Sequence, residues 1–197
     1  TSRSPMSSPR FANCSARTQY TRHLLFSALF ELMVYVVLRV KPSVHAAYQA
    51  LGTLGVEVKS VYNKLGHVEP ATGAALVRES GREVAQLIAA LGGRRQDWIP
   101  GYRVKVIDGN ALAATEHRLK ELRRLAAGPL PGKTIVVYDP ALDAVVDAFP
   151  CEDGHAQERS LLPQVLATFD AGDVQISDRN FCVGSFLWRT HARGAFS

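Results

Sequence analysis

Cysteine is scarce in this sequence. Only three cysteines occur among 197 residues, and they are far apart, at Cys14, Cys151 and Cys182. No two of them form a CxxC pair, and the six histidines are scattered. A structural zinc site is therefore not expected, and a reduced, cytoplasmic compartment is the simpler interpretation.

A long uninterrupted apolar run is also missing. The most apolar segment, residues 24–40, is shorter than the ~20 residues that a membrane-spanning helix needs, and Glu31 lies in its middle. We interpret the segment as a buried core helix and expect no membrane partner. A membrane anchor is the alternative, because the preceding tail carries Arg10, Arg17 and Arg22.

The chain has no strong excess of one charge. It contains 23 Lys plus Arg and 18 Asp plus Glu, for a net charge of +5. This balance permits nucleic-acid binding without requiring it. Hydrophobic residues make up 47 % of the sequence, which is enough for a packed core and argues against general disorder.

The first half of the sequence has a helical pattern. Residues 1–22 are rich in Ser, Arg and Thr and are expected to form a basic, flexible tail. Residues 23–92 predict four helices: the apolar segment, one opened by Pro42, one over 58–66, and one from near Pro70 to Gly92. This region is our candidate for DNA binding.

The second and third of these helices, joined by "GTLG", resemble a helix-turn-helix. In that arrangement the third helix would offer Lys59 and Lys64 to DNA, together with Ser60, Tyr62 and Asn63. An ordinary small helical bundle with a polar outer face explains the same pattern equally well.

After Gly93 the pattern changes to short strands alternating with helices, and we assign residues 93–197 to a second domain. Strands are predicted over 102–109, 133–140, 142–150 and 173–178, the second and third forming a hairpin. An amphipathic helix follows the first strand, another starts near His155, and a helix or loop follows the last. The fold class is therefore α+β or α/β.

The segment "AGPLPGKT", residues 127–134, fits the loose form of a phosphate-binding loop. A true loop of this kind follows a strand and opens a helix, whereas this one follows a helix and enters a strand. Pro129 and Pro131 also remove N–H groups that would bind phosphate. We therefore interpret the match as accidental.

Two aspartates end apolar strands, Asp108 in "VIDGN" and Asp178 in "ISDRN". If the two strands are parallel neighbours, about 4.8 Å apart, both carboxylates lie at the same end of the sheet. Such a pair favours divalent cations, which suit phosphodiester chemistry. Taken singly, either aspartate is equally compatible with a helix cap or a turn residue.

The segments "VIDGNAL", "LPGKTIVVYDP" and "ISDRNFCVGSFL", with the helical segments before them, resemble the DDE-class transposases of bacterial insertion sequences, of the IS-four type. The likeness extends from about Ser27 to Ser197 and is most specific over 106–187. It implies a ribonuclease-H-like catalytic domain. It also implies that two aspartates and one glutamate hold two divalent cations, Mg²⁺ or Mn²⁺, for DNA cleavage and strand transfer.

Carried over by position, the two aspartates of the family are Asp108 and Asp178. The glutamate of the family lies on a later helix, and no residue of this chain corresponds to it, because Glu152 and Glu158 precede the second aspartate. We therefore expect an incomplete ribonuclease-H-like sheet in a C-terminally truncated transposase that does not cleave DNA by itself.

Basic residues could hold the DNA. Arg179 directly follows the second aspartate, and four more basic residues lie off the apolar stripe of the helix after the first strand, Arg118, Lys120, Arg123 and Arg124. Solvated helix surfaces explain the same residues. The expected partners are transposon-end and target DNA and either a second copy or a full-length transposase, in the bacterial cytoplasm at the nucleoid.

Two other functions compete with transposition. A DNA-binding or transposase-interacting remnant would use the helical part without chemistry. A receiver-like or phosphatase-like enzyme would use a lone strand-end aspartate. The phosphatase type expects a second aspartate two residues after the first, whereas position 110 is Asn.

Overall fold

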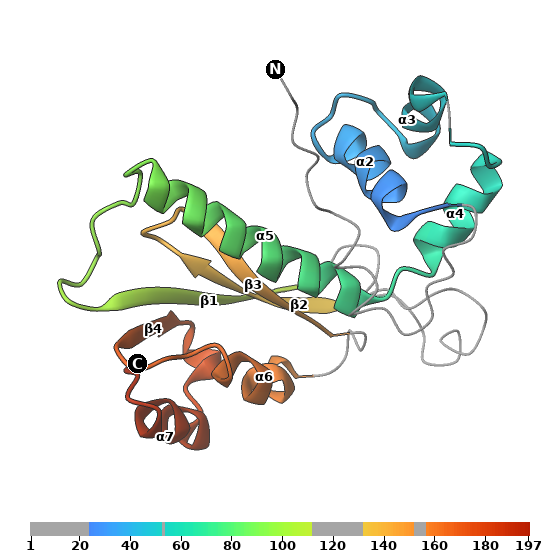
Figure 1. Cartoon of the computed structure of the whole chain (residues 1–197). Helices are drawn as coiled ribbons and strands as arrows, with labels where there is room; N and C mark the ends of the chain where they lie inside the picture. The colour runs from blue at the N-terminus through green and yellow to red at the C-terminus, as the bar shows by residue number, and fades with distance from the viewer. Residues whose placement is uncertain (1–23, 53, 112–131, 152–156) are drawn as a thin grey trace. The chain divides into compact units, whose positions relative to one another are not determined.

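The computed structural model describes residues 24–52, 54–111, 132–151 and 157–197. The chain divides into two compact units between Thr72 and Gly73, earlier in the sequence than the expected domain boundary at 92 and 93. We call the described residues up to Thr72 the helical unit and those from Gly73 onward the sheet unit. The described residues form a mixed α+β structure with a four-stranded mixed sheet (Figure 1).

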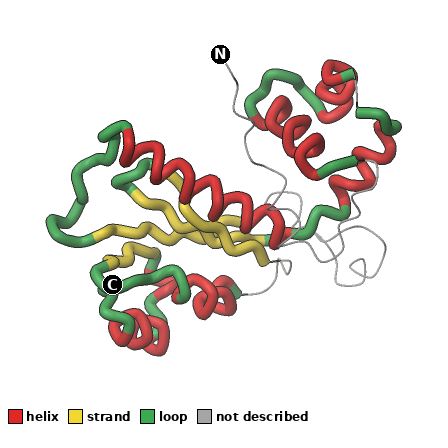
Figure 2. Tube along the Cα trace, viewed as in Figure 1, coloured by secondary structure: helices red, strands yellow, loops and turns green. Residues whose placement is uncertain are grey.

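The helical unit contains α2 (Phe26–Val37), α3 (Val44–Leu51) and α4 (Val58–Gly66), as the sequence predicted (Figure 2). Pro42 does not open α3. Ser43 caps it instead, because its hydroxyl accepts the Ala46 N–H at 3.2 Å. Gly52 ends α3 in the left-handed conformation, with φ 61°.

The three helices share one small core. One of its buried members precedes α2 and the others come from α2, α3 and α4; they are Leu24, Leu29, Leu32, Ala47 and Val61. The Tyr48 hydroxyl donates to the Val56 carbonyl at 2.7 Å, which ties α3 to the turn before α4. Of the helices that the structure describes, none is long and apolar enough to cross a membrane.

The sheet has the strand order β3-β2-β1-β4. The strands are β1 (Arg103–Ala111), β2 (Lys133–Asp139), β3 (Ala144–Cys151) and β4 (Asp173–Ser177). β1 pairs antiparallel with β2, which forms the predicted hairpin with β3, whereas β4 pairs parallel with β1. Phe196 makes one further parallel bridge, to Val174 on β4.

The structure corrects the predicted end of the first strand. β1 continues through Gly109 and Asn110 to Ala111, and Asp108 faces Val136 of β2 within the ladder. Asp108 therefore does not end its strand. On the other side of β1, the partner strand β4 stops at Ser177, and Asp178 follows it as predicted.

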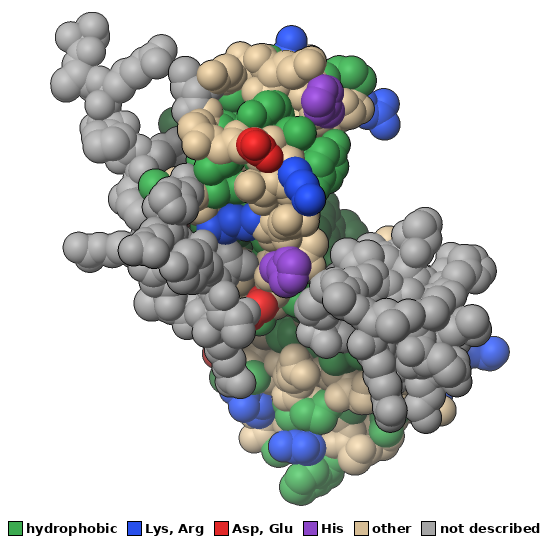
Figure 3. Space-filling view, turned by 90° about the vertical axis from the view of Figure 1, so that its right-hand side faces the viewer, with side chains coloured by type: hydrophobic (Ala, Val, Ile, Leu, Met, Phe, Trp, Pro, Cys, Tyr) green, Lys and Arg blue, Asp and Glu red, His purple; other side chains and the backbone are tan. Residues whose placement is uncertain are grey.

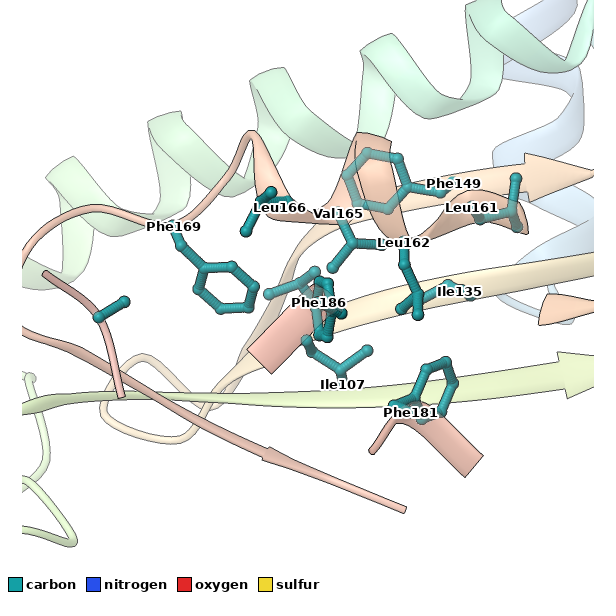
Figure 4. Close-up of a cluster of buried hydrophobic side chains, with 12 residues drawn as sticks. Ile107, Ile135, Phe149, Leu161, Leu162, Val165, Leu166, Phe169, Phe181 and Phe186 are labelled. Carbon is teal, nitrogen blue, oxygen red and sulfur yellow. The ribbon is translucent and has the colours of Figure 1, made fainter. Parts of the chain in front are cut away.

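The hydrophobic core lies on one face of the sheet (Figure 4). Side chains alternate along a strand, and Ile107, Ile135, Val137 and Phe149 turn toward this face, where all four are buried. They pack against side chains from the 3₁₀ turn η2 (Glu158–Leu161), from α6 (Leu162–Leu166) and from α7 (Gly184–Ala192), chiefly Leu161, Leu162, Val165, Leu166 and Phe186.

The segment before α6 is helical only in part. The sequence predicted one helix from about His155, which lies outside the described residues. Within them, a 3₁₀ turn precedes the α-helix, and Pro163 lies in the first turn of α6, where no N–H donor is needed.

Helix α5 (Pro70–Ala90) matches the predicted helix, and nearly all of it belongs to the sheet unit. Its Arg78 makes two hydrogen bonds to Asp147 of β3, both 2.9 Å long. Gly81 allows a close approach, because a Cβ there would lie 2.9 Å from the Cα of Val146. The edge strand β3 therefore holds α5 through an ion pair and a backbone contact.

A buried ion pair joins the beginnings of β1 and β4. Asp173 is fully buried and accepts Arg103 Nε at 2.5 Å, lies 2.7 Å from Lys105 Nζ, and accepts the Asp170 N–H at 2.9 Å. Burial raises the pKa of Asp173, but the hydrogen bonds from Arg103, the Asp170 backbone and Lys105 outweigh it, and the net pKa lies below the ordinary value.

We expect Asp173→Asn to lower the free energy of unfolding by about 3 kcal/mol at neutral pH, because Lys105 and Arg103 lose their buried counter-charge. The folded-state pKa is depressed, so the contribution of Asp173 is present above about pH 4 and is lost as pH falls through the folded-state pKa. In the Asp173→Asn variant, the free energy of unfolding should no longer show this part of the decrease at low pH. Urea unfolding across pH measures both effects.

Asp170→Asn is the control. Its carboxylate contacts Arg103 at 3.3 Å from a side chain that is 73 % exposed, and its loss should cost less than about 1 kcal/mol. Equal losses for the two variants would contradict the assigned role of Asp173.

Candidate functional site

The two predicted aspartates occupy corresponding positions along the parallel pair β1 and β4. Arg103 pairs with Asp173 and Ile107 pairs with Ser177, in an unbroken register with an offset of 70 residues. Asp108 and Asp178 are the residues that directly follow Ile107 and Ser177, the last pair of this ladder. Asp178 keeps an extended backbone, with φ −58° and ψ 151°, before the chain turns. The predicted parallel, adjacent arrangement is therefore confirmed for the strands that carry this pair.

Both carboxylates are accessible. Asp108 and Asp178 are exposed, whereas Ile107, the neighbour of Asp108, is buried in the core. Because side chains alternate, Asp108 lies on the sheet face opposite the core. Within the described ranges, neither carboxylate takes part in an ion pair.

Asp178 also organises the turn that follows β4. Its Oδ1 accepts the N–H of Asn180 at 2.8 Å, as the cap of the 3₁₀ turn η3 (Arg179–Phe181). Arg179 is exposed and is the first residue of that turn. The cap and the candidate ligand are thus the same side chain, and the two interpretations of Asp178 are compatible.

Glu158 lies close to the same end of β1, which the sequence did not indicate. A Cβ added at Gly109 would lie 2.7 Å from Cδ of Glu158 and 2.8 Å from its Oε2. The carboxylate therefore packs on the residue that follows Asp108. Among the described residues, however, no group of three His, Cys, Asp or Glu side chains is close enough to hold a metal ion.

Arg159 is a second residue that sequence reasoning missed. Its Nε donates to the backbone carbonyl of Asn180 at 3.0 Å. With Arg189, Arg159 also flanks a small hollow of about 110 Å³ between η2, α6 and α7, which is lined by Leu162, Pro163, Leu166, Val183, Ser185 and Phe186. No sequence motif predicts the role of Arg159, because its hydrogen-bond partner is the backbone carbonyl of a residue distant in the sequence.

The predicted DNA-contacting residues fall into different settings. In the helical unit, Lys59 is exposed on α4, whereas Lys64 is half-buried, donates to the Leu24 carbonyl, and has its pKa lowered by burial. Arg118, Lys120, Arg123 and Arg124 lie outside the described residues. On the face drawn in Figure 3, the coloured Lys and Arg side chains are spread singly.

The donor set of Asp108 and Asp178 suits a hard cation. Mg²⁺ is commonly held by one or two carboxylates while it keeps several waters, and Mn²⁺ accepts the same oxygen ligands. Two accessible carboxylates, one on β1 and one directly after β4, fit that requirement. Comparison with protein-family models, curated proteins and solved structures finds no match to this chain.

The contact between Glu158 and Gly109 predicts an energetic coupling. In the wild-type chain, Gly109→Ala should lower the free energy of unfolding by about 1 kcal/mol, because the new methyl group displaces the carboxylate. In a Glu158→Ala background the same change should raise it by about 0.5–1 kcal/mol, since Gly is unfavourable inside a strand. Urea unfolding of the four proteins measures the coupling.

Gly73→Ala on α5 is the control, because nothing lies within 4 Å of its added Cβ. Its effect should be the same with and without Glu158. If Gly109→Ala also had one effect in both backgrounds, the Glu158 carboxylate would not lie against Gly109.

Proposed function

We propose that this chain is a protein of DNA transposition, of the DDE transposase type, whose sheet unit binds divalent cations through Asp108 and Asp178. The observation that carries the proposal is the register of β1 with β4, in which Asp108 and Asp178 directly follow the last paired residues, Ile107 and Ser177. The sequence resemblance names the same two residues. A ribonuclease-H-like fold belongs to this proposal, and the mixed sheet, with one aspartate on β1 and one after β4, supports it.

In this proposal each residue has a defined task. Asp108 and Asp178 supply oxygen ligands, and both residues are exposed, so that DNA can approach them. Arg179 binds a DNA phosphate beside them. When bound, two cations would activate the attacking oxygen and stabilise the leaving oxygen of a phosphodiester. Water or a DNA 3′-hydroxyl is the nucleophile for cleavage or strand transfer.

The described residues supply two carboxylates and no third close enough to share a metal ion. We therefore propose that this chain binds metal and DNA without cutting DNA. Its partners are transposon-end and target DNA and a second copy or a full-length transposase. Such a protein would act at the bacterial nucleoid.

A second function has its own observation. On α4, Val61 is buried in the helical core while Lys59, Ser60, Tyr62 and Asn63 are exposed on the outer side. A cation with hydroxyl and amide groups on one helix face can contact DNA phosphates and base edges. The helical unit would then bind DNA without chemistry.

The metal proposal is tested by isothermal titration calorimetry of the full 197-residue chain with Mn²⁺. Asp108→Asn and Asp178→Asn keep the shape of each side chain and remove one anionic ligand. Each should weaken Mn²⁺ binding by at least about tenfold, because even outer-shell partners of metal ligands contribute this much. Asp170→Asn, an exposed aspartate of the same unit, should bind as the wild type does.

Equal Mn²⁺ affinity in all four proteins would contradict the site. Incubation of the wild-type chain with plasmid DNA and Mg²⁺ tests the second half of the proposal, and we expect no nicking. Metal-dependent nicking that Asp108→Ala abolishes would show that this chain is catalytically complete.

The DNA-binding function predicts that Lys59→Ala weakens binding to a labelled duplex in fluorescence anisotropy. The slope of log affinity against log salt should fall in magnitude by about 1, because one phosphate contact is lost. Lys41→Ala removes the same charge from the helical unit outside α4 and should leave the slope unchanged. The same slope change in both variants would show that the charge of the unit matters and the α4 face does not.

A further inference from the structure

The 3₁₀ turn η2 contacts both segments that carry the candidate ligands. Glu158 packs its carboxylate on Gly109, the residue after Asp108. The next residue, Arg159, donates Nε to the carbonyl of Asn180, two residues after Asp178. Two consecutive side chains of one short turn therefore reach β1 and the turn after β4.

Arg159 is linked to Asp178 by two hydrogen bonds in series. Its Nε holds the Asn180 carbonyl at 3.0 Å, and the Asn180 N–H holds Oδ1 of Asp178 at 2.8 Å. Asp178, Arg179 and Asn180 are all exposed, and η3 has only three residues. Phe181, the last residue of η3, is buried in the core and anchors the far end of the turn. The bond from Arg159 adds a restraint on Asn180, the residue whose N–H holds the Asp178 carboxylate.

We propose that Arg159 is a positioning residue for the divalent-cation site, acting on Asp178 through the backbone of Asn180. The inference rests on the proposed function, since it concerns the same two carboxylates. Arg159 touches no cation in this account. Arg159 fixes Asn180, and the N–H of Asn180 holds one oxygen of the Asp178 carboxylate in the cap of η3. The Asp178 carboxylate is thereby oriented for the cation site before a cation binds. Partners of this kind commonly change metal affinity by about tenfold or more.

The sign of the effect separates positioning from simple electrostatics. A nearby guanidinium repels a cation, so removal of its charge alone should strengthen cation binding. Loss of the hydrogen bond to Asn180 should instead weaken it. A charge-neutral variant that binds Mn²⁺ more weakly therefore cannot be explained by charge.

Two neutral variants isolate the single N–H donor. In Arg159→Gln the amide nitrogen occupies the same place along the side chain as Nε of Arg, so the bond to the Asn180 carbonyl can form. In Arg159→Met a methyl group occupies that place, and no donor is present. The two variants have equal charge and similar length, so their difference reports on the hydrogen bond.

Mn²⁺ titration of the full chain is the measurement, with melting temperatures recorded for each protein. We expect Arg159→Met to bind Mn²⁺ about tenfold more weakly than the wild type, and Arg159→Gln to keep most of the affinity. Arg189→Met removes the same charge from the other side of the same hollow and should keep or raise the affinity.

Arg159→Lys provides a second comparison should the Met variant fold poorly. Lysine keeps the charge but has a methylene group at the position of Nε, so it cannot donate a hydrogen bond from there. The Arg159→Lys protein should therefore bind Mn²⁺ more weakly than the Arg159→Gln protein. Equal affinity for Gln and Met, or for Gln and Lys, would overturn the positioning role. Wild-type binding that is absent or independent of Asp108 and Asp178 would overturn the proposed function as well.

Discussion

The pairing of β1 with β4 depends on one buried carboxylate. Asp173 has no access to solvent. Its carboxylate forms ion pairs with Arg103 and Lys105 of β1 and accepts a hydrogen bond from the Asp170 N–H. Arg103 and Asp173 are partners in the ladder, so their bond fixes which residues face each other. A shift of one residue would leave buried charges unpaired, at a cost of several kcal/mol. In this register the ladder ends at Ile107 and Ser177, directly before Asp108 and Asp178.

The carboxylates at the two ends of this strand pair therefore differ in burial and in charge pairing. At the beginning, a carboxylate is buried and neutralised by two cations of the chain. At the far end, two carboxylates are exposed, and no ion pair within the described ranges neutralises them. Like charges on neighbouring strands are unfavourable unless a cation lies between them. This contrast is why we propose cation binding for Asp108 and Asp178 and a structural role for Asp173.

Periodicity and turn residues in the sequence predicted most of the fold. The strands, the hairpin and helices α2, α4 and α5 were predicted close to their observed bounds, because apolar spacing and flanking Gly or Pro are local signals. The end of β1 was misplaced at Asp108, because antiparallel pairing with β2 carries the strand on to Ala111. That pairing depends on residues elsewhere in the chain, and aspartate with glycine is a local sign of a turn.

The candidate site was predictable to the same extent. Asp108 and Asp178 follow apolar segments that are visible in the sequence, so the pair could be named before the sheet order was known. Glu158 and Arg159 could not, because Glu158 lies against a glycine, which has no side chain, and Arg159 binds the backbone carbonyl of Asn180. Contacts to backbone atoms cannot be inferred from residue types, because all residues share nearly the same backbone. The setting of Lys64, whose partner is the Leu24 carbonyl, could not be predicted for the same reason.

Mn²⁺-induced broadening of amide signals in ¹H–¹⁵N NMR spectra of the full chain tests the central claim most directly, because it locates the cation without depending on activity. Substoichiometric Mn²⁺ should first broaden the amides of Asp108, Gly109 and Asp178 to Asn180 together. Broadening centred on any other acidic residue, or on only one of the two strands, would contradict a shared site set by the register of β1 and β4.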